Sequence, residues 1–156
     1  MTNSGTLTGR VAFEASTLGN TFVNSGTISG GVSMGANSTN TFTAVTGSSV
    51  SSGGGIGLSL GGLLGVNLTF APTGQVDGGA NGSNTLILQN PGATGSSGTG
   101  TASSATYVNF NNLTINGGTW TLQGPLVSGS TTLNGGISQF DNSATFGTGA
   151  ITANGG

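Results

Sequence analysis

The chain has 156 residues, 33 of them glycine, with one basic residue, three acidic residues, no His, no Cys and a formal net charge of −2. A single cation cannot supply the phosphate contacts of a nucleic-acid-binding surface or form a polybasic membrane patch. The lack of cysteine excludes disulfides, thiolate metal sites and a catalytic thiol. The N-terminal segment MTNSGTLTGR has no basic and apolar regions typical of a signal peptide, and the longest apolar tract is too short and glycine-rich to span a bilayer.

The first forty residues contain a repeat. NSGTLTGRVAF from Asn3 matches NSGTISGGVSM from Asn24 at an offset of 21 residues, which places Val11 on Val32. Both copies are followed by the triplet Asn-Thr-Phe, so that Phe22 has its equivalent one repeat later. Such a fixed period predicts a repeat architecture in which each unit packs on its neighbours.

A third copy of the repeat occurs further along the chain. GQVDGGANGSNTL from Gly74 aligns with an earlier segment at an offset of 44 residues, so that Val76 falls on Val32 and Asn84 on Asn40. We interpret this offset as two periods of about 22 residues, with one complete repeat between the two copies.

Within the repeats, apolar residues alternate with small polar ones. This period of two is typical of strands with one buried face, and glycine, asparagine and serine between them mark turns. The alternating residues include Ile56, Leu58 and Leu60, then Val66, Leu68 and Phe70, and finally Leu113 and Ile115.

Two segments interrupt the pattern. Residues 91–104, PGATGSSGTGTASS, contain no large apolar residue, so we predict a loop excursion from one corner there. A shorter excursion is predicted at GSSVSSGGGIG, from Gly47. Loops that leave a regular scaffold either carry binding function or are tolerated insertions, and here we favour the second interpretation.

The triplet Asn-Gly-Gly occurs three times near the C-terminus, beginning at Asn116, Asn134 and Asn154. Glycine provides the positive φ that a tight corner needs, and stacked asparagine side chains can hydrogen-bond from one coil to the next. We therefore predict an all-β fold, a parallel β-helix of about seven coils of roughly 18–22 residues each, extending over residues 1–156 as a single domain.

Aromatic residues are predicted to lie mainly in the core. Phe13, Phe22 and Phe42 fall at equivalent or inward phases of the repeat. In the segment TWTL we expect Trp120 and Leu122 both to point inward, with a bend in the strand between them.

The C-terminal segment GSTTLNGGISQFDNSATFGTGAITANGG, from Gly129, resembles the passenger-associated transport repeat of bacterial autotransporters. The residues that carry the resemblance are Thr131, Thr132, Leu133, Gly135 and Gly136, then Gly147, Gly149, Ala150, Ile151, Asn154 and Gly156. A looser similarity to autotransporter passengers and filamentous adhesins covers the whole chain. The resemblance implies a right-handed parallel β-helix at the cell surface, normally carried by a C-terminal outer-membrane barrel. We expect residues 1–156 to be a fragment, with the export signal and barrel outside it.

The sequence predicts no catalytic, cofactor-binding or metal-binding site. Glu14, Asp77 and Asp141 lie in different repeats, whereas polysaccharide cleavage requires carboxylates close together. GGANGSNTLIL, from Gly78, is similar to a calcium β-roll repeat, but Asn84 stands where that repeat has Asp, so we favour a capping turn.

Thr-x-Thr pairs begin at Thr6, Thr39 and Thr119, at different phases of the repeat. They do not predict an ice-binding array, which needs such pairs in register on one flat face.

The sequence thus predicts a structural and interaction segment of a secreted or cell-surface adhesin, a β-helical stalk that presents loops and assists passenger folding during secretion. Its expected partners are adjacent coils of a longer passenger, further copies of itself end to end, and a host protein or glycan, without nucleic acid or a membrane span. The alternatives are a polysaccharide-processing β-helix enzyme and a self-assembling extracellular fibre module.

Overall fold

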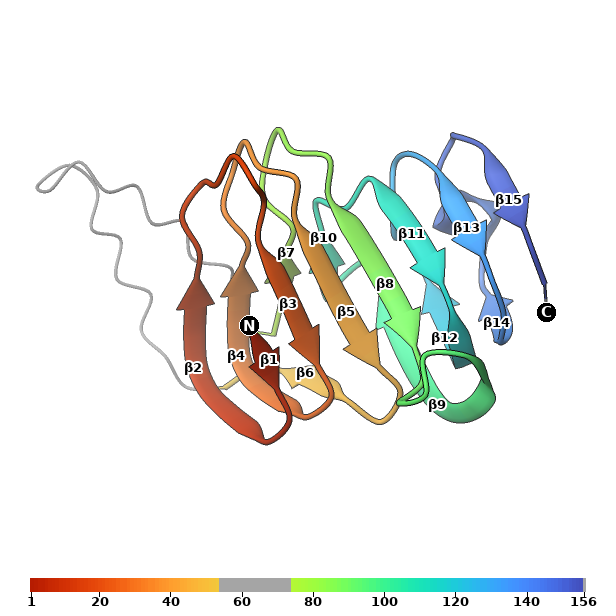
Figure 1. Cartoon of the computed structure of the whole chain (residues 1–156), viewed down its shortest axis with the longest axis horizontal. Helices are drawn as coiled ribbons and strands as arrows, with labels where there is room; N and C mark the ends of the chain where they lie inside the picture. Colours follow the sequence, from red (N-terminus) through yellow and green to blue (C-terminus); the bar gives the residue numbers. More distant parts are fainter. Residues whose placement is uncertain (54–73, 156) are drawn as a thin grey trace, which may run out of the picture.

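A computed structural model describes residues 1–53 and 74–155 and shows three parallel β-sheets wound into a β-solenoid of about six coils (Figure 1). Sheet A runs the length of the molecule in the order β1 (Thr2–Asn3), β3 (Thr21–Asn24), β5 (Thr41–Val45), β8 (Thr85–Gln89), β11 (Asn112–Ile115), β13 (Thr131–Leu133) and β15 (Ile151–Ala153).

The other two sheets each cover part of that length. Sheet B has the order β10 (Tyr107–Val108), β7 (Val76–Asp77), β4 (Thr27–Ser33) and β2 (Thr6–Ala12), with β6 (Ser49–Ser51) also on β4. Sheet C has the order β14 (Ile137–Phe140), β12 (Gly117–Gln123) and β9 (Gly95–Ser103), and one 3₁₀ turn, η1 (Ser143–Phe146), follows β14. In Figure 1, sheet A runs downward in front of the upward strands of sheets B and C while the chain advances from left to right, which is a right-handed coil.

The predicted vertical register is confirmed. Val11 pairs with Val32 between β2 and β4, and Phe22 pairs with Phe42 between β3 and β5. The two phenylalanine rings stack with their centroids 5.4 Å apart, and Phe13 packs edge-on against Phe22 at 6.2 Å. Because each coil buries its apolar residues against equivalent residues of the next coil, neighbouring coils form one continuous core.

The predicted number of about seven coils is close to the observed number of about six, and the difference arises in the third coil. Val32 pairs directly with Val76, and Phe42 pairs directly with Leu86, so the offset of 44 residues is one long coil and not two. In this coil β6 pairs with the first half of β4 and β7 with the second half. Residues 54–73, which include the last four residues of the predicted second excursion at 47–57 and the predicted alternating run from Ile56 to Phe70, lie outside the described residues. Within the described part of that excursion, Ser49–Ser51 forms β6 and pairs with β4, so the prediction of a loop is wrong there.

The prediction of a loop excursion at residues 91–104 is wrong for most of that segment. Gly95–Ser103 forms β9, which pairs with β12 at Gly95 and again from Thr99 to Ser103, with a register shift between, and the residues before it form a turn. Its small side chains have a physical reason, because Gly100 lies opposite Trp120 and an added Cβ would come within 2.4 Å of the indole ring. The bulk of this layer of the core therefore comes from β12, and β9 contributes backbone pairing.

Trp120 and Leu122 both point into the core, as predicted, and are 2% and 0% exposed. The predicted bend between them is wrong, because residues two apart in a strand already share a face and both pair regularly with β14. The irregularity of β12 lies earlier, between Gly117 and Thr119.

Two ladders of asparagine side chains hold the corners. In the buried ladder, the backbone N–H of Asn20 donates to Oδ1 of Asn40 (2.9 Å), that of Asn40 to Asn84 (3.1 Å), and that of Asn84 to Asn111 (2.8 Å). Nδ2 of Asn40 and of Asn84 each donates to two backbone carbonyls at 2.7–2.9 Å. These asparagines satisfy buried polar groups of the turn between sheets B and A.

The second ladder confirms the prediction made from the Asn-Gly-Gly triplets. Nδ2 of Asn134 donates to Oδ1 of Asn116 (2.9 Å), and Nδ2 of Asn154 donates to Oδ1 of Asn134 (2.8 Å). This ladder is exposed to solvent. The corner therefore repeats with the same side-chain contact in successive coils.

Candidate binding site

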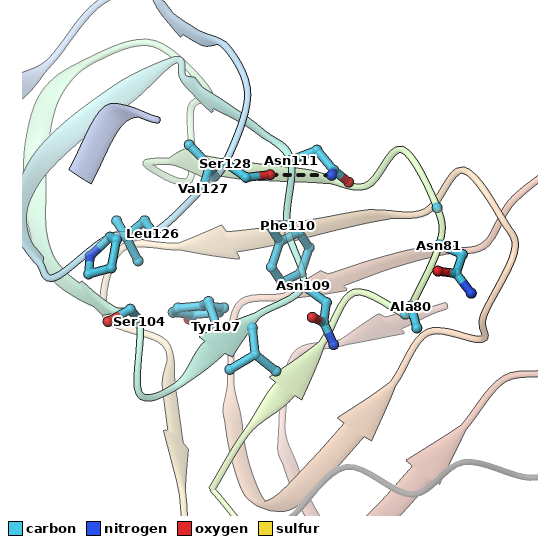
Figure 2. A pocket seen from close by; sticks show the side chains of 14 residues that line it. Ala80, Asn81, Ser104, Tyr107, Asn109, Phe110, Asn111, Leu126, Val127 and Ser128 are labelled. Carbon is cyan, nitrogen blue, oxygen red and sulfur yellow. Dashed lines mark hydrogen bonds between the residues drawn. The ribbon is translucent and has the colours of Figure 1, made fainter. Parts of the chain in front are cut away.

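A depression of about 550 Å³ lies where sheet B ends (Figure 2). β10 is the last strand of this sheet, and in the next coil the loop after β12 takes the place of a strand. The depression is lined by residues 79–82, 104, 107–111 and 125–128, which belong to three successive corners. Its volume is in the range of small-ligand sites.

The floor of the depression is apolar. Tyr107 and Phe110 are 5% and 3% exposed, and their ring centroids lie 6.4 Å apart in an edge-to-face arrangement. Leu126 and Val127, from the loop after β12, are also buried and belong to the same core cluster. Burial raises the pKa of the Tyr107 phenol above its usual range, so this residue is a neutral group at physiological pH.

The rim is polar and carries amide and hydroxyl groups. Asn81 and Asn109 adopt left-handed backbone conformations (φ 58° and 59°), which turn the chain at the edge of the depression. Nδ2 of Asn109 donates to Oδ1 of Asp77 (2.8 Å). Nδ2 of Asn111 donates to Oγ of Ser128 (3.4 Å), and this second bond is drawn in Figure 2. A neutral rim over an aromatic floor suits an uncharged polar ligand such as a saccharide.

The structure does not bring the three acidic residues together. Glu14 follows β2, Asp77 ends β7, and Asp141 follows β14 in another sheet. Oδ1 of Asp77 also accepts from the backbone N–H of Gly79 (2.8 Å), and Asp141 accepts from the backbone N–H of Gly124 (2.9 Å). Each aspartate thus stabilises a turn. Within residues 1–53 and 74–155, no group of three or more His, Cys, Asp or Glu residues is placed to hold a metal ion.

The segment that is similar to a calcium β-roll forms a turn of the solenoid. Nδ2 of Asn84 donates to the carbonyls of Gly79 (2.7 Å) and Asn109 (2.9 Å), while its Oδ1 accepts from the backbone of Asn40 (3.1 Å). The amide is therefore fully engaged in linking three coils. This geometry agrees with the interpretation of the segment as a turn.

Comparisons of the chain with protein-family models, with curated proteins and with solved structures found no match. In the part of the chain that the structure describes, none of the helical segments has the length and apolar character needed to cross a bilayer.

Sequence reasoning missed the depression because its residues are exceptions to the repeat. Tyr107 and Phe110 follow the segment that was predicted to be an excursion, and Pro125 follows β12 where the earlier coils continue into sheet B. A proline at this position was the available signal, since it cannot donate to a sheet ladder.

Proposed function

We propose that the chain is a structural and interaction segment of a cell-surface, autotransporter-like adhesin: a β-helical stalk that presents a glycan-binding depression. The observation that supports this most directly is the continuous stack of coils, in which sheet A and the shared core connect each coil to the next and the two asparagine ladders link successive corners. A stack of this kind forms a stiff spacer, since each coil is held by its neighbours.

The same arrangement suits export in an unfolded state. Each coil needs a neighbour to bury its apolar side chains, so folding proceeds coil by coil once a first pair has formed. The chain contains no cysteine that has to be oxidised in the correct pairing. We infer that the segment assists folding of the passenger at the cell surface, as the resemblance to autotransporters implies.

The C-terminal coil provides a surface for a further coil. Phe140 and Ile151 are 54% and 56% exposed on β14 and β15, although their register partners in the preceding coil, Leu122 and Thr131, are buried, and Ile137 on β14 is also 52% exposed. The edge of β15 is an unpaired strand edge of sheet A. We propose that another β-coil covers these residues, either from a longer parent chain or from a second copy.

Light scattering over a concentration series distinguishes the two sources. Concentration-dependent association that Phe140→Asp abolishes indicates a second copy, whereas a strict monomer indicates a coil of the parent chain.

The glycan-binding role is tested with the immobilised chain on an array of neutral and acidic glycans. We expect binding to neutral glycans, and we expect Ser128→Trp, which fills the depression from its rim, to abolish it. Gln123→Trp, an exposed position on β12 outside the depression, is the matched control and should bind normally. Release of reducing ends from a bound glycan would instead favour a polysaccharide-processing enzyme. If no glycan on the array binds, the glycan-binding role is refuted.

A further inference from the structure

The outer face of sheet A carries an unbroken column of seven β-branched side chains, one from each strand. Successive parallel pairings connect these positions, from the first strand of the sheet to the last. Five of the seven are threonines, and the members in order are Thr2, Val23, Thr43, Ile87, Thr114, Thr132 and Thr152.

A second column runs beside the first, two residues earlier in each strand. Thr21, Thr41 and Thr85 are paired in register, and Asn112 continues the column on β11. Oγ of Ser130 donates to Oδ1 of Asn112 (2.9 Å), which places a hydroxyl next in line. The two columns thus form a ladder of short polar and methyl-bearing side chains.

The spacing of this ladder is regular in two directions. Neighbouring strands lie about 4.8 Å apart, and residues two apart in a strand are separated by roughly 6.6 Å. Figure 1 shows the strands of sheet A side by side along the whole molecule. The side chains are also rigid, because β-branching restricts rotation about χ1. The face therefore repeats a nearly rectangular grid of hydroxyl and methyl groups.

The hydroxyls of the grid are available to an external partner. Among the described residues, no hydrogen bond to protein involves the hydroxyl of any of its threonines, in contrast to the inward Thr131, whose Oγ1 donates to the carbonyl of Phe146 (2.8 Å). Thr43 is buried, at 6% exposed, so the first column is recessed at this strand, whereas Thr2, Thr114, Thr132 and Thr152 of the same column are partly or fully exposed.

The grid is uncharged. The four charged side chains of the protein lie elsewhere: Arg10 in β2, Glu14 after it, Asp77 in β7 and Asp141 after β14. Neither column contains an aromatic ring on which a sugar ring could stack. A neutral, aromatic-free, periodic face is complementary to a neutral lattice of hydrogen-bonding oxygens and not to an ion, a nucleic acid or a crystalline polysaccharide.

We propose that the outer face of sheet A binds ice. The oxygen rows of ice repeat at a distance close to the spacing between strands. The threonine hydroxyls of one column can therefore occupy positions of oxygen atoms in the ice lattice, and the adjoining methyl groups exclude mobile water. Of the Thr-x-Thr pairs noted in the sequence, those that begin at Thr6 and Thr119 lie in β2 and β12 and play no part in this face, whereas the pair that begins at Thr39 contributes its second member, Thr41, to the second column. The array is formed by one residue from each coil, and because these residues are unequally spaced along the chain, the sequence shows no repeat that would predict it.

The experiment measures thermal hysteresis and partition of the protein into a growing ice hemisphere. Thr114→Tyr places a bulky ring in the middle of the seven-membered column but retains a strand-favouring residue, so we expect near-complete loss of both signals. Thr121→Tyr makes the same change at an exposed position on the outer face of sheet C and should retain them. Matching circular dichroism spectra and melting curves establish that both variants are folded.

Four results would overturn the proposal. The first is a wild-type chain that neither produces hysteresis nor enters the ice fraction. The second is a Thr114→Tyr variant that is as active as wild type, and the third is equal loss in both variants. Binding of the wild-type chain to crystalline cellulose or chitin without binding to ice would also contradict it.

Discussion

Replacing Asn40 by leucine tests whether the buried asparagine ladder stabilises the solenoid. Asn40 is fully buried, and its Nδ2 donates to the carbonyls of Gly35 and Gly78, both at 2.8 Å. Its Oδ1 accepts from the backbone N–H of Asn20 at 2.9 Å. Leucine leaves three backbone groups without these partners, and each such group costs about 1–3 kcal/mol. The three groups together cost about 3–9 kcal/mol, and added apolar burial offsets roughly 1.5–3 kcal/mol of this, so we expect a net loss of about 1.5–6 kcal/mol.

Asn134→Leu is the matched control, since Asn134 makes two side-chain bonds of similar length in the exposed ladder, to Asn116 and from Asn154. Its partners can bond to water after the change, so the expected loss is less than about 1 kcal/mol. Urea unfolding followed by circular dichroism and by the fluorescence of Trp120, the one tryptophan of the chain, measures both free energies of unfolding. Equal losses in the two variants, or an Asn40→Leu variant as stable as wild type, would refute the role of burial.

Three further predictions concern the core, a close backbone approach and a buried phenol. Val32→Asp places an unpaired carboxylate at a fully buried position and should unfold several coils. Ser97→Asp, at an exposed position in β9, should leave the melting temperature nearly unchanged, and equal effects of the two changes would contradict the core assignment. Gly30→Ala would place Cβ 1.6 Å from the carbonyl oxygen of Gly9. Gly9 also has a positive φ, but a Cβ added there would meet no atom within 4 Å. Gly30→Ala should therefore lower the melting temperature more than Gly9→Ala, and the reverse order would contradict the close approach. Because burial raises the pKa of Tyr107 above its unfolded value, the part of the stability that depends on this phenol should be fully present below about pH 10 and be lost as the pH rises above it; Tyr107→Phe should remove this alkaline loss in pH-dependent urea unfolding, and a variant that keeps it would contradict the cause.

The sequence was sufficient to predict the repeat and the register between neighbouring coils. The match of Val11 to Val32 and the alternation of apolar residues within each repeat predict parallel stacked strands, because residues at equivalent phases must share a face. The Asn-Gly-Gly triplets likewise predict the contact from Asn116 to Asn134. These features depend on local chemistry repeated at a fixed interval.

Features that depend on compensation between distant segments were not predictable in this way. The small residues of β9 resemble a loop until Trp120 is placed opposite Gly100, since only then is the missing volume accounted for. The depression at Tyr107 arises because sheet B ends, which no single repeat records. The threonine column is formed by strands at unequal intervals along the chain, so it has no sequence period of its own.

The third coil has a practical consequence for the use of this chain as a carrier. β6 and β7 occupy adjoining stretches of the same neighbour, β4, although residues 52–75 separate them along the chain. The two flanking strands are therefore each held in place by their own pairing with β4. A foreign peptide grafted between Ser51 and Val76 should be displayed at a defined height on the rod while the remaining coils keep their order.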